Sequence, residues 1–235
     1  MAESTGSLIA FLDADDIWLP DKLERQLAYL DNHPNVVIVS GQMIWWHVRR
    51  DSRHIERFGV APGRNVHREL TVRNIVGNPS MALMRRTALD QAGPFDETLR
   101  WGQDWEMFVR LARVGDLGWL DVPVVIYRWH GKSLSRDNRW VRLDTLQRIA
   151  WRAIDDYQPA WQRPLLRERA WSSLELDRAR LALSTNRPRL DHVRHAIGAF
   201  AVWPFDDTRA KAEFAARSLI GEQAYQRLRR LRARR

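Results

Sequence analysis

Apolar and polar positions follow two different patterns along the chain. In the first part, short apolar runs of strand length, Ser7–Leu12 and Val36–Ser40, flank a segment with helical periodicity, Pro20–His33. A proline at the first helical position and leucines at every third or fourth residue predict a helix there. Strand, helix and strand in this order predict a βαβ unit, and hence an α/β domain with a mostly parallel sheet flanked by helices.

The next elements are less regular. Residues 41–76 give only weak strand signals. Ser80–Met84 is predicted to be a strand, followed by a short helix over Thr87–Ala92. A stronger helix is predicted for Gln103–Val114, which has a continuous apolar face, and a further strand for Val122–Tyr127.

From about Trp140 onward the pattern changes to successive helices with a period near 3.6 residues. We therefore predict two parts, an α/β part over residues 1–138 and an all-helical extension over residues 139–235. Charge separates the same two parts: residues 1–138 carry 17 basic and 18 acidic side chains, whereas residues 139–235 carry 21 and 11. All of the excess positive charge therefore lies in the extension.

Composition excludes some classes of protein. The chain has no cysteine, so neither disulfides nor thiolate metal sites are possible. No apolar run reaches the ~18–20 residues of a membrane-spanning helix. The arginine-rich extension fits either a genomic bias toward arginine codons or a surface for phosphates and anionic lipid. Nucleic acid is not an expected partner, because no recognition motif accompanies the basic charge.

A cluster of carboxylates, Asp13, Asp15 and Asp16, ends the first predicted strand. Three carboxylates within four positions repel one another unless a cation or hydrogen-bond donors compensate. A hard divalent cation prefers such oxygen ligands and leaves room for substrate phosphates. The alternative is a solvated turn whose aspartates cap the next helix.

The wider string around this cluster has a family resemblance. Ile9–Asp16 (IAFLDADD), Trp18–Pro20 (WLP) and Leu23–Gln26 (LERQ) resemble the Asp-x-Asp segment of family 2 glycosyltransferases, which have the GT-A fold. The resemblance implies that Asp15 and Asp13 bind Mn²⁺ or Mg²⁺ and that Asp13 and Asp16 contact the metal or the ribose of a nucleotide-diphosphate-sugar. A cation there would neutralise the charge of the departing nucleoside diphosphate.

A second match covers Gly93–Glu97 (GPFDE) and Gln103–Ala112 (QDWEMFVRLA), which resemble the acceptor-side block of the family. In inverting members an aspartate at the start of this helix is the general base, and here that position is Asp104. An aspartate in a first helical turn also has a structural explanation, because it interacts favourably with the helix dipole. Gln103 stands where the family usually has glutamate.

Two further segments resemble the family. Tyr127–His130 (YRWH) follows the last core strand, and the resemblance implies that His130 is a further metal ligand, although an isolated histidine is more often structural. Asn78–Ala82 (NPSMA) and Arg85 match the segment that lies near donor and acceptor. The resemblance thus assigns Asn78 and Arg85 to the nucleotide-sugar site, with solvent exposure as the alternative for Arg85.

The resemblance covers about residues 2–136 and lacks the Pro-Thr-Tyr-Asn-like first strand that binds the nucleobase, so we expect a partial GT-A domain. The implied function is metal-dependent, inverting sugar transfer from a nucleotide-diphosphate-sugar to a hydroxyl of a glycan, a lipid-linked intermediate or a cell-surface polymer, as in polysaccharide biosynthesis of the cell envelope. The alternative is an inactive remnant that binds a partner.

The C-terminal segment 222–235 has a basic amphipathic pattern. Tyr225, Leu228 and Leu231 lie three residues apart, among six arginines. Such a helix can lie in the headgroup plane of an anionic membrane, or its apolar residues can pack on the preceding helices. We expect a cytoplasmic protein with peripheral contact at the inner face of the membrane.

Overall fold

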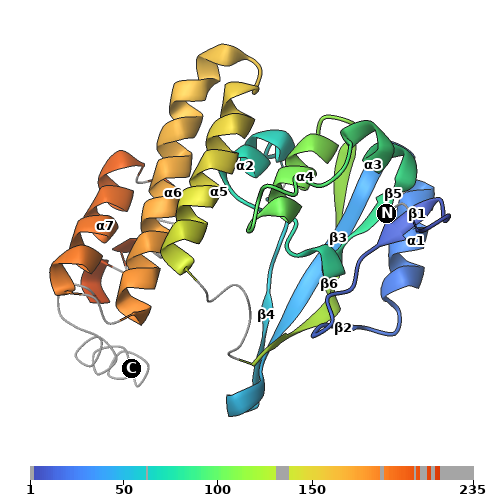
Figure 1. The fold of residues 1–235 in the computed structure, drawn as a ribbon, viewed down its shortest axis with the longest axis horizontal. Helices are drawn as coiled ribbons and strands as arrows, with labels where there is room; N and C mark the ends of the chain where they lie inside the picture. Colours follow the sequence, from blue (N-terminus) through green and yellow to red (C-terminus); the bar gives the residue numbers. More distant parts are fainter. Residues whose placement is uncertain are drawn as a thin grey trace. The chain divides into compact units, whose positions relative to one another are not determined.

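The computed structural model describes residues 3–61, 63–130, 138–185, 188–203, 205–206, 211–212 and 215–217. The chain forms two compact units, Met1–Asp137 and Asn138–Arg235 (Figure 1). Unit 1 contains the sheet and unit 2 contains helices.

The sheet of unit 1 has the strand order β1-β5-β3-β6-β2, with β4 paired to β3. Its strands are β1 (Leu8–Ala10), β2 (Ile17–Trp18), β3 (Val36–His47), β4 (Ser52–Glu56), β5 (Leu83–Arg85) and β6 (Asp116–Trp129). The α/β class is confirmed, but the expectation of a mostly parallel sheet is wrong for the described strands. Of their pairings, only β3 with β6 is parallel. The reason is that β5 runs antiparallel between β1 and β3, which are therefore parallel to each other without being hydrogen-bonded neighbours.

The helices of unit 1 pack around this sheet. They are α1 (Lys22–Asn32), α2 (Val66–Val72), α3 (Arg86–Ala92) and α4 (Gln103–Leu111), with 3₁₀ turns η1 (Val48–Arg50) and η2 (Pro79–Met81). Leu30 of α1 packs into a buried cluster with Val39 of β3 and Leu83 of β5. At Gly118 of β6, a Cβ would lie 2.3 Å from the ring of Tyr29, so only glycine allows α1 to approach β6 this closely.

A buried polar pair joins α1 to the sheet. Lys22 is 1% exposed, and its Nζ donates to Gln26 Oε1 at 2.7 Å and lies 4.5 Å from the ring centroid of Trp18. Gln26 Nε2 in turn donates to the carbonyls of Val39 (3.0 Å) and Met81 (2.7 Å). Burial lowers the pKa of Lys22 to about 8. The side chain of Gln26 therefore links α1 to β3 and to η2.

Unit 2 consists of α5 (Arg139–Asp155), η4 (Ala160–Gln162), α6 (Arg163–Ser184) and α7 (Arg189–Val202) in its described part. A buried polar network joins two of these helices: Glu175 accepts from Arg178 Nη1 at 2.9 Å and contacts His195 Nδ1 at 2.7 Å. Within the described ranges, none of the helices combines the length and the apolar character needed to span a membrane.

Candidate functional site

The acidic loop between β1 and β2 is held against η2. The amide of Asp16 donates to the carbonyl of Asp13 (3.0 Å), which closes a turn. The amide of Asp13 donates to Ser80 Oγ (3.0 Å), and Trp18 Nε1 donates to the carbonyl of Ser80 (2.9 Å). Both ends of the loop are thereby anchored on the same residue, 62 to 67 positions away in the sequence.

The turn before η2 presents Asn78 to this loop. Gly77 has a φ of +99°, and a Cβ there would lie 2.2 Å from Met81 Sδ, so glycine is required. Asn74 fixes the turn, because its Oδ1 accepts from the amides of Val76 and Gly77 at 3.0 and 3.1 Å. Asn78 Nδ2 then donates to Asp16 Oδ2 at 2.8 Å.

The carboxylates of the loop are electrostatically strained. Burial raises the pKa of Asp16, and hydrogen bonds from Ser80 and Asn78 only partly oppose that shift. The pKa of Asp13 is also raised, first by burial and then by the negative charge of Asp15. A cation bound at the loop would favour the ionised forms and reverse both shifts.

The loop also meets the end of β6. His130 Nε2 lies 2.9 Å from Asp15 Oδ2, with both side chains 39% exposed. Arg128 Nε donates to the carbonyl of Asp15. The pairing of β2 with β6 explains this proximity, because it sets Trp18 opposite Val125 and brings the residues after Tyr127 alongside the loop. Residues 115 positions apart therefore meet at one edge of the sheet.

Two observations bear on metal binding. Asp16 Oδ1 and Asn78 Oδ1 are buried without a hydrogen-bond partner, which leaves oxygen atoms available to a cation or a ligand hydroxyl. Across the residues that the structure describes, no group of three or more histidine, aspartate and glutamate side chains forms a preformed metal site. The residues thus fit a cation that has few protein ligands and completes its shell with substrate phosphates and water.

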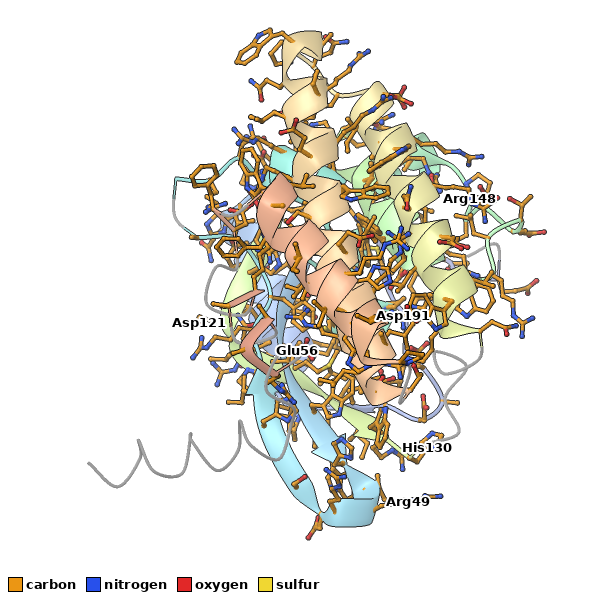
Figure 2. The ribbon with its side chains drawn as sticks, turned by 90° about the vertical axis from the view of Figure 1, so that its left-hand side faces the viewer. Arg49, Glu56, Asp121, His130, Arg148 and Asp191 are labelled. Atoms are coloured by element: carbon orange, nitrogen blue, oxygen red, sulfur yellow. The ribbon has the colours of Figure 1, made fainter. Side chains whose placement is uncertain are left out.

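A cavity of about 300 Å³ adjoins this edge. Its lining consists of Ala14, Asp15, Trp46, Val48, Arg128 and His130. The residues Trp46 and Val48 belong to the hairpin that β3 forms with β4. Figure 2 shows Arg49 at the tip of this hairpin and His130 at the same end of the unit. The hairpin and the acidic loop therefore line the same cavity.

Comparison with known proteins finds similarity to one family of enzymes. Residues 1–93 match the family model "Glycosyl transferase family 2". The chain is thus similar to glycosyltransferase family 2 over its first 93 residues. It is 27% identical over 113 residues to the amylovoran biosynthesis glycosyltransferase AmsE of Erwinia amylovora, covering 47% of this chain and 40% of that protein. It is 25% identical over 154 residues to uncharacterized proteins of Mycobacterium bovis and Mycobacterium tuberculosis, covering 60% of this chain and 41% of each.

The chain thus spans about two fifths of the length of these curated relatives. Unit 1 has the mixed α/β architecture of part of a GT-A domain, and a helical region follows it. Glycosyl transfer is the activity of the family whose model matches residues 1–93.

The candidate general base, Asp104, lies in the first turn of α4 and is half-buried. Trp105 fixes that turn, because its Nε1 donates to the carbonyl of Leu70 at 2.7 Å. The segment preceding α4 touches the residues before the acidic loop, since the rings of Phe11 and Phe95 pack edge to face at 5.7 Å. Asp104 does not line the 300 Å³ cavity.

Arg85 is placed differently from the other candidates. Its register partner is Leu8, at the end of β1 opposite to the one that leads into the acidic loop. Its Nε donates to the carbonyl of Val36 and its Nη2 to that of Leu30, both at 2.8 Å. Arg85 thus stabilises the C-terminal end of α1, and we leave it out of the proposed donor site.

The structure brings together Asp13, Asp15, Asp16, Asn78 and His130, and it adds residues that sequence reasoning did not assign. Ser80 and Trp18 anchor the acidic loop, and Arg128 contacts its backbone. Trp46 shares the cavity with Asp15. The only sequence signal for Ser80 was its place beside Asn78 in the matched segment.

Proposed function

We propose that this chain takes part in metal-dependent transfer of a sugar from a nucleotide-diphosphate-sugar to a hydroxyl acceptor, with inversion at the anomeric carbon. The observation that carries the proposal is the 2.9 Å contact between Asp15 and His130. It joins the two sequence segments that resemble the family's metal-binding residues, in a chain whose first 93 residues match the family model.

The acidic loop provides the donor side of the site. Asp15 and His130 would hold Mn²⁺ or Mg²⁺, with Asp13 as an additional carboxylate, since carboxylate and imidazole together suit Mn²⁺. Asp16, oriented by Asn78, has a free Oδ1 that can accept from a ribose hydroxyl. When bound, the cation supplies compensation for the negative charge of the departing nucleoside diphosphate.

The acceptor side depends on Asp104. As general base, its carboxylate takes the proton of the acceptor hydroxyl while that oxygen attacks the anomeric carbon from the face opposite to the leaving diphosphate. A negatively charged side chain in the first turn of a helix interacts favourably with the helix dipole, which is compatible with a carboxylate at this position.

The acceptor class follows from the relatives. One similar protein is a biosynthesis enzyme for amylovoran. We therefore infer that the acceptor is a glycan or a lipid-linked intermediate of cell-envelope polysaccharide biosynthesis, used at the inner face of the membrane.

Incubating the chain with Mn²⁺ and a panel of nucleotide-sugars, and measuring nucleotide release, tests the activity. Release that does not depend on metal would contradict the proposal.

The metal assignment has its own test. Mn²⁺ should raise the melting temperature of the unaltered chain, and Asp15→Ala and His130→Ala should each reduce that rise, because each removes one of few protein ligands. Differential scanning fluorimetry with and without Mn²⁺ measures it. Asp31→Ala removes an exposed carboxylate from α1 and should keep the full rise. An undiminished rise in both site variants would show that the metal binds elsewhere.

The segment 222–235 lies outside the described residues, and its membrane contact stays a prediction from sequence. Six arginines at ~1 kcal/mol each are enough for measurable, salt-sensitive binding to anionic lipid. Co-sedimentation with phosphatidylglycerol vesicles should therefore fall when residues 222–235 are removed. Equal sedimentation of both forms would argue against a lipid-binding tail.

A further inference from the structure

The hairpin of β3 and β4 has two aromatic faces with different surroundings. On one face, the ring of Trp45 packs 4.7 Å from Tyr127 and 6.1 Å from His54, and this face continues into the buried cluster around Met43. On the other face, Trp46 lines the cavity shared with Asp15 and His130. The first face stabilises the hairpin, whereas the second is open to a ligand.

Trp46 stands in a row with two arginines. It is in register with Arg53 of β4 and with Arg128 of β6, so the three side chains share one face of the sheet. Arg53 Cζ lies 4.6 Å from the indole centroid. Trp46 Nε1 donates to Asp51 Oδ1 at 3.1 Å, which fixes the orientation of the ring.

The two guanidinium groups retain N–H donors for a ligand. Arg53 is exposed and Arg128 uses its Nε for the carbonyl of Asp15. In the part of the chain that the structure describes, neither group forms an ion pair with a carboxylate. Arg49 and Arg50 of η1 add further positive charge at the tip of the same hairpin. In this row, Trp46 supplies an aromatic surface, and the planar guanidinium groups of Arg53 and Arg128 supply N–H donors for an anion.

We propose that this row is an acceptor subsite for an anionic saccharide, a sugar that carries a carboxylate or a phosphate. The indole of Trp46 packs against the sugar ring, and Arg53 and Arg128 bind the anionic group. The cavity of about 300 Å³ is at the small end of ligand pockets and suits one sugar residue. Naming this ligand the acceptor rests on the proposed function, whereas its binding requires neither donor nor metal.

Calorimetric titration of the full chain in chelator tests the subsite. The probes are a glucuronate-containing hyaluronan tetrasaccharide, a neutral chitin tetrasaccharide and a glucose linked to a short prenyl diphosphate. We expect at least one anionic probe to bind about tenfold or more tightly than the neutral one. Whichever anionic probe binds more tightly identifies the source of the charge, a carboxylated glycan or a phosphate-linked sugar.

Three variants separate stacking from charge. Trp46→Ala should weaken binding of the anionic probe about tenfold. Arg53→Gln should weaken it about as much and leave the weak binding of the neutral probe unchanged. Arg57→Gln is the matched control, because Arg57 is an exposed arginine near the hairpin that pairs with Asp121 at 2.6 Å instead of facing the cavity. It should bind like the unaltered chain.

Several results would overturn the subsite. Equal binding of neutral and anionic probes, or unchanged binding in Arg53→Gln, would remove the role of charge, and the exposed position of Arg53 makes misfolding of that variant no explanation. Displacement of the saccharide by uridine diphosphate would mean that the row belongs to the donor. Saccharide binding in a chain that releases no nucleotide would contradict the transfer proposal while leaving the subsite intact.

Discussion

Asp104→Asn should lower the rate of sugar transfer by about 100-fold or more, while leaving the affinity for the donor nearly unchanged. The amide has the shape of the carboxylate but cannot accept a proton, and general-base catalysis typically contributes 10²–10⁴-fold. Donor binding depends on the acidic loop, so it should be insensitive to this change. Initial rates at saturating donor, together with donor titration, measure the two effects separately.

The control for Asp104 is Asp90→Asn, which removes an exposed carboxylate from α3. It should retain full activity. If Asp104→Asn were as active as the unaltered chain, the base would have to lie elsewhere. Glu106 is the next carboxylate on α4, but both of its oxygens accept from Arg110, at 2.8 and 2.6 Å. Both carboxylate oxygens of Glu106 are thus already engaged by a neighbouring side chain.

Lys22 should make the free energy of unfolding depend strongly on pH under alkaline conditions. Its pKa is about 8 in the folded chain and 10.5 ordinarily. Below pH 8 the folded state must bury the charge. Between pH 8 and 10.5 the folded state has lost the proton and the unfolded state still holds it, so stability rises with pH by about 3 kcal/mol. Lys22→Met lacks this group and should lack that rise.

Urea denaturation of both forms at pH 7, 8, 9 and 10 provides the test, because other titrating groups cancel in the difference between them. Arg25→Met is the matched control on the same helix, where the arginine is exposed and pairs with Asp21. Its difference from the unaltered chain should stay nearly constant over this range. A constant difference for Lys22→Met as well would mean that the folded chain does not lower the pKa of Lys22.

The strands and helices near the acidic loop could be predicted because their apolar periodicity is simple. The predicted helix over Pro20–His33 corresponds to α1, and the predicted strand Val36–Ser40 is the first part of β3. For the second part of β3 and all of β4, the sequence shows only weak strand patterns. Ser52–Glu56 is exposed throughout, so its strand pairing depends on β3 and leaves no alternation of buried and exposed residues in the sequence.

Candidate residues that belong to a sequence motif could be assigned from the sequence, whereas residues that only the fold brings to the candidate site could not. The meeting of Asp15 with His130 could be expected only through the resemblance, since no local pattern encodes a contact across 115 residues. The burial of Lys22 could not be predicted from the sequence, because lysine side chains are mostly exposed in folded proteins. Arg85 was assigned by its position in a matched segment, whereas its hydrogen bonds to Val36 and Leu30 depend on the register of β5.

The hydrogen bonds that hold the acidic loop on η2 have a consequence for its dynamics. Releasing the loop breaks the bonds of Asp13 and Trp18 to Ser80, and the neighbouring Met81 is fully buried and bonded to Gln26. The loop should therefore exchange its amide hydrogens as part of a larger cooperative unit instead of fraying alone. Its carboxylates are then ordered during folding, so a ligand arriving there loses little affinity to the entropy of arranging them.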